Sequence, residues 1–290
     1  MLAEFCTTIK IKKMNTQKVW FITGASKGMG LETAKLVLAN GDKLVATSRN
    51  VNELMSSLGE TSENFLPLAL DITNDGAVSD AIFKSIVHFG RLDVVLNNAG
   101  YYLVGSLEEI SEEEFRKTQE VNVFGTVNII RHVLPYLRKQ QSGHIINIAS
   151  NMGYMGYANT GSYNAAKFAV VGLSEALAQE VKPFGIKVTV VAPGMFRTNF
   201  MSDYTLVVAK KDVIGYGKKE HVAMLSSFNG HQPGDPKKLA QALNAIVKAE
   251  EPPVHLVLGP DSYNSILEHR KNEQTEMEQW KHLSFSTNFD

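Results

Sequence analysis

The sequence contains one cysteine, no long apolar run and no excess of either charge. The single cysteine, Cys6, excludes an internal disulfide and predicts a protein of the reducing cytoplasm. Lysine and arginine total 29 against 30 aspartates and glutamates; without a basic excess, neither nucleic acid nor an acidic membrane is an expected partner. Apolar stretches such as 168–173 are far shorter than the ~18 residues of a membrane span. The eight histidines include no H-E-x-x-H pair, and one cysteine cannot form a thiolate zinc site, so no metal site is predicted.

The chain does contain enough apolar sequence for a sizeable core. Its 290 residues are 44% apolar and 20% charged, a composition typical of folded proteins. Met1–Lys13 has no uninterrupted apolar core or cleavage site, so a secretory signal is not expected. The sequence predicts an N-terminal tail over 1–16 and a single domain over 17–290. A weak targeting segment, or sequence upstream of a start at Met14, is the alternative explanation of the first residues.

Short β-branched or aliphatic runs alternate with amphipathic segments from Lys18 onward. Seven runs are expected to be strands: Val19–Thr23, Leu44–Thr47, Phe65–Leu70, Asp93–Leu96, His144–Ile148, Lys187–Val191 and Val254–Leu258. The expected helices include Leu31–Ala39, Ala77–His88, Ala165–Val181 and Pro236–Lys248. Strands that are apolar on both faces and separated by helices indicate a parallel sheet covered on both sides. The predicted fold class is α/β, a single-domain Rossmann-type doubly wound parallel sheet of about seven strands with helices on both faces.

The longest stretch without a clear pattern is about 195–235, which is rich in glycine. Loops of this length inside a domain are usually functional, so we expect an irregular substrate loop that covers the site as a lid. The stretch contains four lysines, which we expect to be solvated: Lys210, Lys211, Lys218 and Lys219.

The first expected strand leads into Thr23-Gly24-Ala25-Ser26-Lys27-Gly28-Met29-Gly30, and a helix follows at once. Glycines permit a tight turn and close backbone approach, and a helix N-terminus faces the ligand, so this arrangement is typical of dinucleotide binding. Three glycines at this spacing are expected only about 0.1 times by chance in a chain of this composition. A glycine-rich turn without a ligand is the alternative.

The pattern Tyr163-x-x-x-Lys167 is a second signal. Residues four apart share one face of a helix, and a nearby ammonium lowers the pKa of a phenol toward the working range. Alone the pattern is weak, because about 0.7 occurrences are expected by chance. An exposed pair on a solvated helix would explain it equally well.

Polar residues follow two further strands, where ligands bind in open α/β sheets. Asn97-Asn98-Ala99-Gly100 follows the fourth expected strand, and Ser150-Asn151 follows the fifth. Asparagines in turns often bond only local backbone, so neither site is informative in isolation.

In combination, these residues resemble the short-chain dehydrogenase/reductase family in its single-domain, NADP(H)-preferring form. The matching residues, in family order, are Thr23-Gly24-x-x-x-Gly28-x-Gly30, Asn97-Asn98-Ala99-Gly100, Asn122, Ser150, Tyr163-x-x-x-Lys167 and Pro193-Gly194 with Thr198. The resemblance covers about residues 17–260. The chain lacks a serine common before the lysine and a proline common before the tyrosine, but neither change removes a chemically active side chain.

The resemblance implies hydride transfer between a nicotinamide and a carbonyl or alcohol. Tyr163 would donate a proton to the carbonyl oxygen, or accept it in reverse. Lys167 would lower the pKa of Tyr163 and bond the nicotinamide ribose. Ser150 would bond the substrate oxygen, and Asn122 would hold a water that links Lys167 to solvent, or only satisfy backbone groups within its helix.

The expected cofactor is NADP(H). NAD sites carry an acidic residue at the end of the second strand, whereas this strand ends Ala46-Thr47-Ser48-Arg49 and Asp42 lies before it. Arg49 and Lys27 are placed to bind a 2′-phosphate, unless both are ordinary surface cations. Asp71 would bond the adenine and Thr198 the carboxamide or a phosphate. The full set of expected cofactor-binding residues is Gly24, Ser26, Lys27, Gly28, Met29, Gly30, Arg49, Asp71, Ile72, Asn98, Ala99, Gly100, Tyr163, Lys167, Pro193, Gly194 and Thr198.

The substrate is expected to be a small carbonyl or alcohol compound with an apolar or aromatic body. The candidate pocket residues are Tyr101, Tyr102, Tyr154, Met155, Tyr157, Phe196, Met201 and Tyr204, some of which could instead pack the 195–235 loop. Two alternatives are a 3-ketoacyl thioester reductase and a non-catalytic NADP(H)-binding redox sensor. The small residues of the 165–178 helix, with the resemblance, favour a homodimer or homotetramer, although a buried core helix would look the same.

Overall fold

The structure is a computed structural model that describes residues 17–201 and 205–289. The expected N-terminal tail and the candidate pocket residue Tyr204 lie outside the described residues. Within these ranges, no helix has the length and apolar character needed to cross a membrane.

All seven predicted strands are confirmed, with ends that differ by at most two residues. They are β1 (Val19–Thr23), β2 (Lys43–Ser48), β3 (Phe65–Ala69), β4 (Val94–Asn97), β6 (Gly143–Ile148), β7 (Ile186–Pro193) and β9 (His255–Leu258). They form one parallel sheet in the order β3-β2-β1-β4-β6-β7-β9. The predicted α/β fold with a doubly wound parallel sheet is confirmed.

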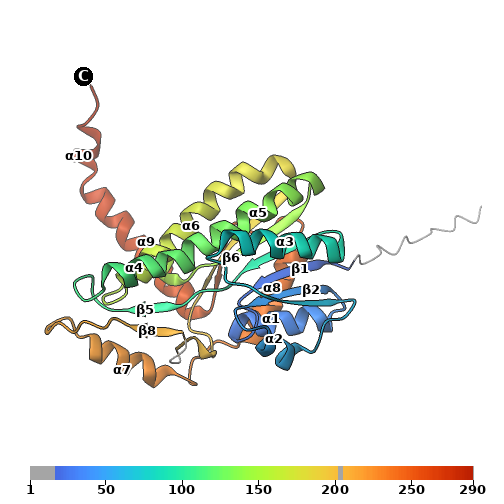
Figure 1. Cartoon of the computed structure of the whole chain (residues 1–290). Coiled ribbons are helices and arrows are strands. Elements are labelled where there is room, and N and C mark those ends of the chain that lie inside the picture. The colour runs from blue at the N-terminus through green and yellow to red at the C-terminus, as the bar shows by residue number, and fades with distance from the viewer. Residues whose placement is uncertain (1–16, 202–204, 290) are drawn as a thin grey trace, which may run out of the picture.

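The sheet is buried on both faces because its strands are apolar at consecutive positions. Successive side chains of a strand point to opposite faces. In β1, Val19 and Phe21 join one apolar cluster while Trp20 and Ile22 join another. Helices α3 (Asp75–Phe89), α5 (Gly125–Gln140) and α6 (Gly161–Val181) pack into the first cluster. Helices α1 (Gly28–Ala39), α2 (Val51–Leu58) and α8 (Pro236–Lys248) pack into the second, so helices cover both faces, as Figure 1 shows.

The strand order reverses between β1 and β4. From β1 the chain first builds outward through β2 and β3, and then returns to place β4 on the other side of β1. The loops that leave β1 and β4 therefore part at this point and leave a crevice at the carboxyl ends of the strands, where α/β sheets bind ligands. The predicted glycine loop and Asn97-Asn98-Ala99-Gly100 both lie at this reversal.

The 195–235 segment is more regular than predicted. It contains strand β8 (Leu206–Val208) and helix α7 (Lys218–Phe228). Strand β8 pairs in parallel with β5 (Tyr102–Val104). In the view of Figure 1, α7 lies below β8 and β5 lies above it. Strand β8 was not predicted because a strand of three residues carries little periodic signal.

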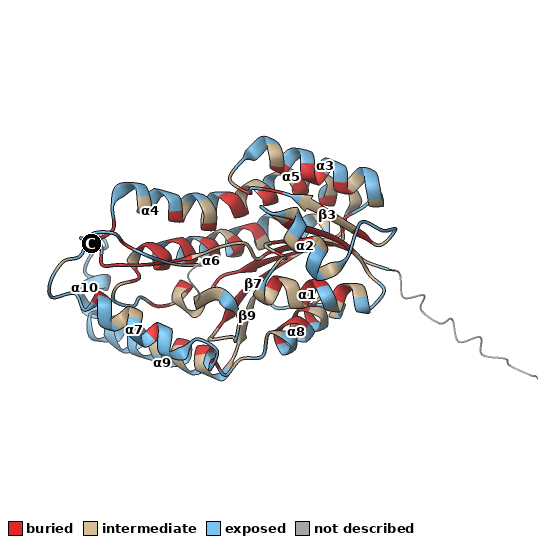
Figure 2. Ribbon diagram, turned by 60° about the horizontal axis from the view of Figure 1, so that its bottom comes forward, coloured by how far each residue is buried: buried red, intermediate tan, exposed pale blue. Residues whose placement is uncertain are grey.

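The chain ends in two helices with little contact to the rest of the molecule. Helix α9 (Pro260–Gln279) begins against β9, and Figure 1 shows it leading with α10 (Lys281–Phe285) away from the sheet. Figure 2 shows the outer part of α9 and all of α10 exposed, in contrast to the buried strands. Helix α4 (Glu112–Gln119) lies instead beside α6 and β5.

Candidate active site

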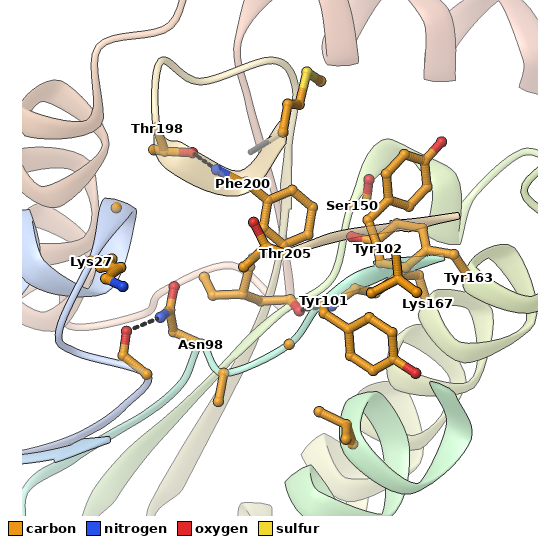
Figure 3. Close-up of a pocket in the computed structure, with 18 of the residues that line it drawn as sticks. Lys27, Asn98, Tyr101, Tyr102, Ser150, Tyr163, Lys167, Thr198, Phe200 and Thr205 are labelled. Carbon is orange, nitrogen blue, oxygen red and sulfur yellow. Dashed lines mark hydrogen bonds between the residues drawn. The ribbon is translucent and has the colours of Figure 1, made fainter. Parts of the chain in front are cut away.

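A large cavity opens at the carboxyl ends of the strands. Its volume is about 1730 Å³, above the ~300–1,000 Å³ of most small-molecule sites, which is room for a dinucleotide together with a second ligand. The glycine loop, the ends of β2, β4 and β6, and the 194–201 segment all contribute to its wall, together with Thr205 and Val207. Figure 3 shows Lys27, Asn98 and Thr198 toward one end and Ser150, Tyr163 and Lys167 toward the other.

The glycine loop brings the ends of β1 and β4 into direct contact. Gly24 has φ +64°, and a Cβ there would lie 2.9 Å from Cα of Ala99. Asn98 fastens the two loops, because its Nδ2 donates to the carbonyls of Thr23 and Gly24, both at 3.0 Å. A side chain at Gly30 would collide with this arrangement, since its Cβ would lie 2.5 Å from Asn98 Nδ2. Glycine is therefore required at all three positions of the motif, at Gly24 and Gly28 by a positive φ and at Gly30 by the lack of space for a Cβ.

Gly30→Ala is expected to weaken NADPH binding by at least tenfold, because the added Cβ must displace the Asn98 amide or the Gly24 carbonyl. Fluorescence titration of NADPH measures the change. The matched control is Gly172→Ala, at an exposed position of α6 where a Cβ meets nothing within 4 Å. This substitution should stabilise the helix by ~0.5–1 kcal/mol. Unchanged affinity in the Gly30 variant would contradict this function of the loop.

Helix α1 presents its N-terminus to the cavity. Its N-cap residue, Lys27, makes no side-chain capping bond, so the backbone N–H groups of the first turn are not satisfied by a cap. Gly28, at φ +57°, lies against Thr198, where a Cβ would approach within 3.3 Å of the threonine Cβ. Uncapped N–H groups carry the positive end of the helix dipole and bind phosphate. These residues could hold the pyrophosphate of a dinucleotide.

Charged side chains gather where β2 and β3 end. Lys27 forms an ion pair with Glu53 of α2 at 3.3 Å, and Arg49, which lines the same end of the cavity, is exposed. Asp71 uses Oδ1 to accept bonds from the backbone and hydroxyl of Thr73, at 3.0 and 2.8 Å. The sequence analysis overlooked Glu53 because it lies in α2, beyond the strand end where an acidic residue is normally sought.

Tyr163 and Lys167 lie buried on one face of α6, each 5% exposed. An exposed pair on a solvated helix is therefore the wrong explanation of the motif. The Lys167 ammonium donates to the carbonyl of Ile148 at 2.9 Å and lies 5.5 Å from the centre of the Tyr163 ring. Burial lowers the pKa of Lys167 to about 8. Burial raises the pKa of Tyr163, against the opposing effect of a hydrogen bond with Ser150, so the phenol is protonated at neutral pH.

Ser150 follows the end of β6 and lines the cavity together with Tyr163 of α6. It caps a short turn over Asn151–Gly153, in which its Oγ accepts from the backbone of Met152 at 3.2 Å and donates to Asn151 Oδ1 at 3.0 Å. The turn holds the serine hydroxyl in one place at the cavity wall.

Asn122 lies in a π-helical turn, Glu120–Phe124, between α4 and α5. Its Oδ1 accepts from the backbone of Tyr101 at 3.2 Å, and its Nδ2 donates to the carbonyls of Tyr101 and Thr118, both at 3.1 Å. The side chain therefore ties the turn to the segment after β4. Gly100 separates it from Lys167, since a Cβ there would lie 2.5 Å from Asn122 Oδ1 and 3.8 Å from Lys167 Nζ.

Most of the predicted site residues share this cavity. All the expected cofactor-binding residues line it except Gly30, which lies behind the loop, and of the four expected catalytic residues only the buried Asn122 does not reach the wall. Tyr154 and Met155 are wrongly placed among the pocket candidates. The Tyr154 hydroxyl bonds His255 Nδ1 at 2.7 Å, and Met155 packs against Ala192 and Ile266.

The substrate end of the cavity has an apolar wall that sequence reasoning found only in part. Tyr101, Tyr102, Tyr157, Phe196 and Met201 line it as expected. Further lining residues come from the β6 turn, the 194–201 segment and α7: Met152, Phe200, His221, Met224, Leu225 and Phe228. The α7 residues recur every three or four positions, a signal that could have been found.

A buried ion pair holds the α7 segment in place. Lys218 is only 6% exposed, against expectation, and its ammonium lies 3.3 Å from Glu109. Burial alone would raise the pKa of Glu109, but hydrogen bonds from Ser106, Val213 and Lys218 lower it to about 2. The Glu109 carboxyl is thus ionised at neutral pH, and its ion pair with Lys218 anchors the wall formed by α7. Across 17–201 and 205–289, no group of three metal-binding side chains comes together.

The chain matches a known family and several proteins along most of its length. Residues 18–206 match the family described as short chain dehydrogenase. Oxidoreductase BOA17 of Botryotinia fuckeliana is 36% identical over 271 residues, covering 93% of this chain and 99% of the relative. A 3-ketodihydrosphingosine reductase of Bacteroides thetaiotaomicron is 38% identical over 248 residues, covering 84% and 88%.

Solved structures share the fold. A short-chain dehydrogenase from Streptomyces avermitilis superposes with a TM-score of 0.87 at 34% identity, covering 94% of this chain and all of its own. ElxO with NADP bound gives 0.68 at 29% identity, covering 83% and 96%. A protein of Burkholderia phymatum in complex with NAD gives 0.77 at 22% identity, covering 90% and 95%, and shows the fold alone. Proteins of this fold thus appear with either cofactor.

Proposed function

Because the chain belongs to the short-chain dehydrogenase/reductase family, we propose that it is an NADP(H)-dependent oxidoreductase that interconverts a ketone or aldehyde and an alcohol. The supporting observation is that the buried Tyr163 and Lys167 and the partly buried Ser150 line the same cavity as an uncapped helix N-terminus. A protonated phenol beside a hydroxyl and an ammonium is suited to proton transfer. The dinucleotide, when bound, supplies or takes the hydride.

Each residue has one task in this proposal. The hydroxyls of Ser150 and Tyr163 bind the carbonyl oxygen and stabilise the negative charge that develops there. In reduction, the Tyr163 O–H bond breaks and its proton goes to that oxygen, leaving a phenolate beside the Lys167 ammonium. In oxidation, the phenolate takes the proton of the alcohol. Asn122 is a positioning residue, because it fixes the segment after β4, whose Gly100 lies against Lys167.

The test is oxidation of NADPH across a panel of ketones, aldehydes and 3-ketoacyl thioesters, followed at the absorbance of the reduced cofactor. Turnover of ketones or aldehydes supports the proposal, and preference for the thioesters supports the ketoacyl alternative. NADPH binding without turnover of any compound would favour the redox sensor and contradict the proposed activity.

We propose a preference for NADP(H) because Lys27 and Arg49 border the end of the cavity where β2 stops. A charge-assisted hydrogen bond contributes about 1.5–3 kcal/mol. Lys27→Gln with Arg49→Gln is therefore expected to reduce the NADPH-to-NADH ratio of kcat/KM by about 10²-fold or more. The control is Arg91→Gln, which removes an exposed arginine at the opposite, amino end of β4.

Glu53 provides the discriminating experiment, since a carboxylate near the ribose is what an NAD site needs. Glu53→Gln should leave kcat/KM with NADPH unchanged or increase it. The substitution removes the carboxylate that forms an ion pair with Lys27 at 3.3 Å. A selective loss with NADH, or equal efficiency of the wild type with the two cofactors, would contradict the NADP(H) preference.

A second candidate function is reduction of a long-chain 3-ketone. One relative at 38% identity is described as a 3-ketodihydrosphingosine reductase. The apolar wall of Phe200, Met201, Leu225 and Phe228 would suit an extended aliphatic chain. Including 3-ketodihydrosphingosine in the substrate panel tests this possibility directly.

The cysteine content and two exposed aromatic side chains bear on location and assembly. We propose a cytoplasmic protein because the chain has a single cysteine. We propose a homo-oligomer because Phe124 and Phe168 are exposed on the π-helical turn and on α6, 51% and 46%. Light scattering of the purified protein measures the assembly.

A further inference from the structure

Two polar side-chain atoms in the cavity wall have no partner among the described residues. They are the hydroxyl of Tyr102, in β5, and Nε2 of His221, in α7, both buried. The other three buried side-chain atoms of this kind belong to Asn97, Ser162 and Gln232, which do not line the cavity. Leaving a buried polar group unpaired costs about 1–3 kcal/mol. Two such groups in one wall indicate a ligand that supplies the missing hydrogen bonds.

The surroundings of Tyr102 offer no alternative partner. Its ring meets Tyr163 edge-on with centroids 4.7 Å apart and stacks on Phe200 at 6.4 Å, and Figure 3 shows it beside Tyr163 and Lys167. The remaining neighbours in its cluster are apolar, among them Val104 and Leu225. The Tyr102 ring therefore lies against Tyr163, and its buried hydroxyl has no partner among the described residues.

Both side chains are uncharged at neutral pH. Burial raises the pKa of the Tyr102 phenol well above its usual value, and burial lowers the pKa of His221. A neutral phenol and a neutral imidazole can each donate or accept one hydrogen bond. They suit an uncharged oxygen, such as a hydroxyl or an ester carbonyl, and provide no charge to balance a carboxylate.

We propose that Tyr102 and His221 bind a second, uncharged oxygen of the substrate, apart from the carbonyl held by Ser150 and Tyr163. This inference rests on the proposed function and narrows its substrate class. The substrate is a ketone, or the corresponding alcohol, with an apolar body and a hydroxyl or acyl oxygen near the reacting carbon. Sites built to hydrogen-bond a substrate group discriminate strongly against analogues that lack it.

Three ketones of equal chain length test the pair: 1-hydroxy-3-octanone, ethyl 3-oxohexanoate and 4-nonanone. The first carries an additional hydroxyl, the second an ester, and the third no second oxygen. Tyr102→Phe is expected to lower kcat/KM about 10- to 100-fold for whichever oxygenated ketone matches the site, mostly through KM, and less than threefold for 4-nonanone. Dividing each variant's kcat/KM by the wild-type value for the same ketone removes the different intrinsic reactivities of the three ketones.

His221→Phe should show the same selective loss if both side chains bind one oxygen. The matched control is Tyr101→Phe, which removes the hydroxyl of the adjacent cavity tyrosine. That hydroxyl is already bonded to Thr118 Oγ1 at 3.1 Å. Its removal should therefore change kcat/KM for all three ketones by a common factor. The thermal unfolding temperature of Tyr102→Phe should equal or exceed that of wild type, because the substitution removes an unpaired buried hydroxyl.

The possible failures are distinguishable. Equal losses for all three ketones in Tyr102→Phe would overturn the assignment and leave the proposed function intact. Turnover of none of the three ketones would contradict the proposed function for this class of substrate. Ligand binding to the NADP⁺ complex then tests the assignment of Tyr102 and His221. The NADP⁺ complex should be stabilised more by 1-hydroxy-3-octanone or the ester than by 4-nonanone, with the difference lost in Tyr102→Phe. Equal thermal shifts in the wild-type complex would overturn the assignment.

Discussion

Replacing Tyr163 with phenylalanine is expected to lower kcat by about 10³-fold or more while NADPH affinity stays within about threefold. The substitution removes the only proton of the side chain that can reach the substrate oxygen in the proposed mechanism. The ring remains in its place, because it is buried against Tyr102 and Phe200. Single-turnover reduction measured beside an NADPH titration separates the chemical step from cofactor binding.

Tyr154→Phe is the matched control for this experiment. It also removes a largely buried phenol, but the Tyr154 hydroxyl bonds His255 and lies outside the cavity lining. Its turnover is expected to stay near that of wild type. A Tyr163 variant that keeps a near-normal rate would remove this residue from the assigned function, and parallel losses in both variants would indicate a general structural effect.

Sequence reasoning found the sheet and the cofactor end of the cavity because both depend on local signals. Strands apolar on both faces identify themselves by composition, and φ near +60° at Gly24 and Gly28 can be anticipated from a glycine motif between strand and helix. The strand reversal between β1 and β4 then places the motif and Asn98 at one crevice, as tertiary rules predict.

The substrate end was harder to predict because it depends on contacts between distant segments. Tyr102 and Tyr154 look alike in sequence, each next to a motif, yet one lines the cavity and the other bonds His255 about a hundred residues away. The α7 wall depends on the pairing of Lys218 with Glu109, which no spacing rule connects. Likewise, Glu53 approaches Lys27 only because α2 folds back toward the glycine loop.

Lys167→Met is the second variant with a large expected effect, a fall in kcat/KM of about 10²-fold or more. The Lys167 pKa of about 8 leaves the ammonium mostly protonated at neutral pH, and in the proposed mechanism this charge stabilises a phenolate at Tyr163. Without that charge, alcohol oxidation should need a higher pH, because the phenol must lose its proton unaided. The pH profile of oxidation should therefore move upward in the variant; an unshifted profile would limit Lys167 to binding.

Stability against pH tests the same lysine without any turnover. The ordinary lysine pKa of 10.5 is lowered to about 8 in the folded protein, so between these pH values the unfolded chain binds the additional proton. The free energy of unfolding contributed by Lys167 therefore rises with pH across this window, after its lowest level below pH 8. Lys167→Met lacks that rise, and subtracting the two denaturation curves cancels the other titrating groups. A difference that stays flat from pH 8 to 10.5 would show that the pKa of Lys167 is not lowered in the folded protein, and would contradict the desolvation of its ammonium.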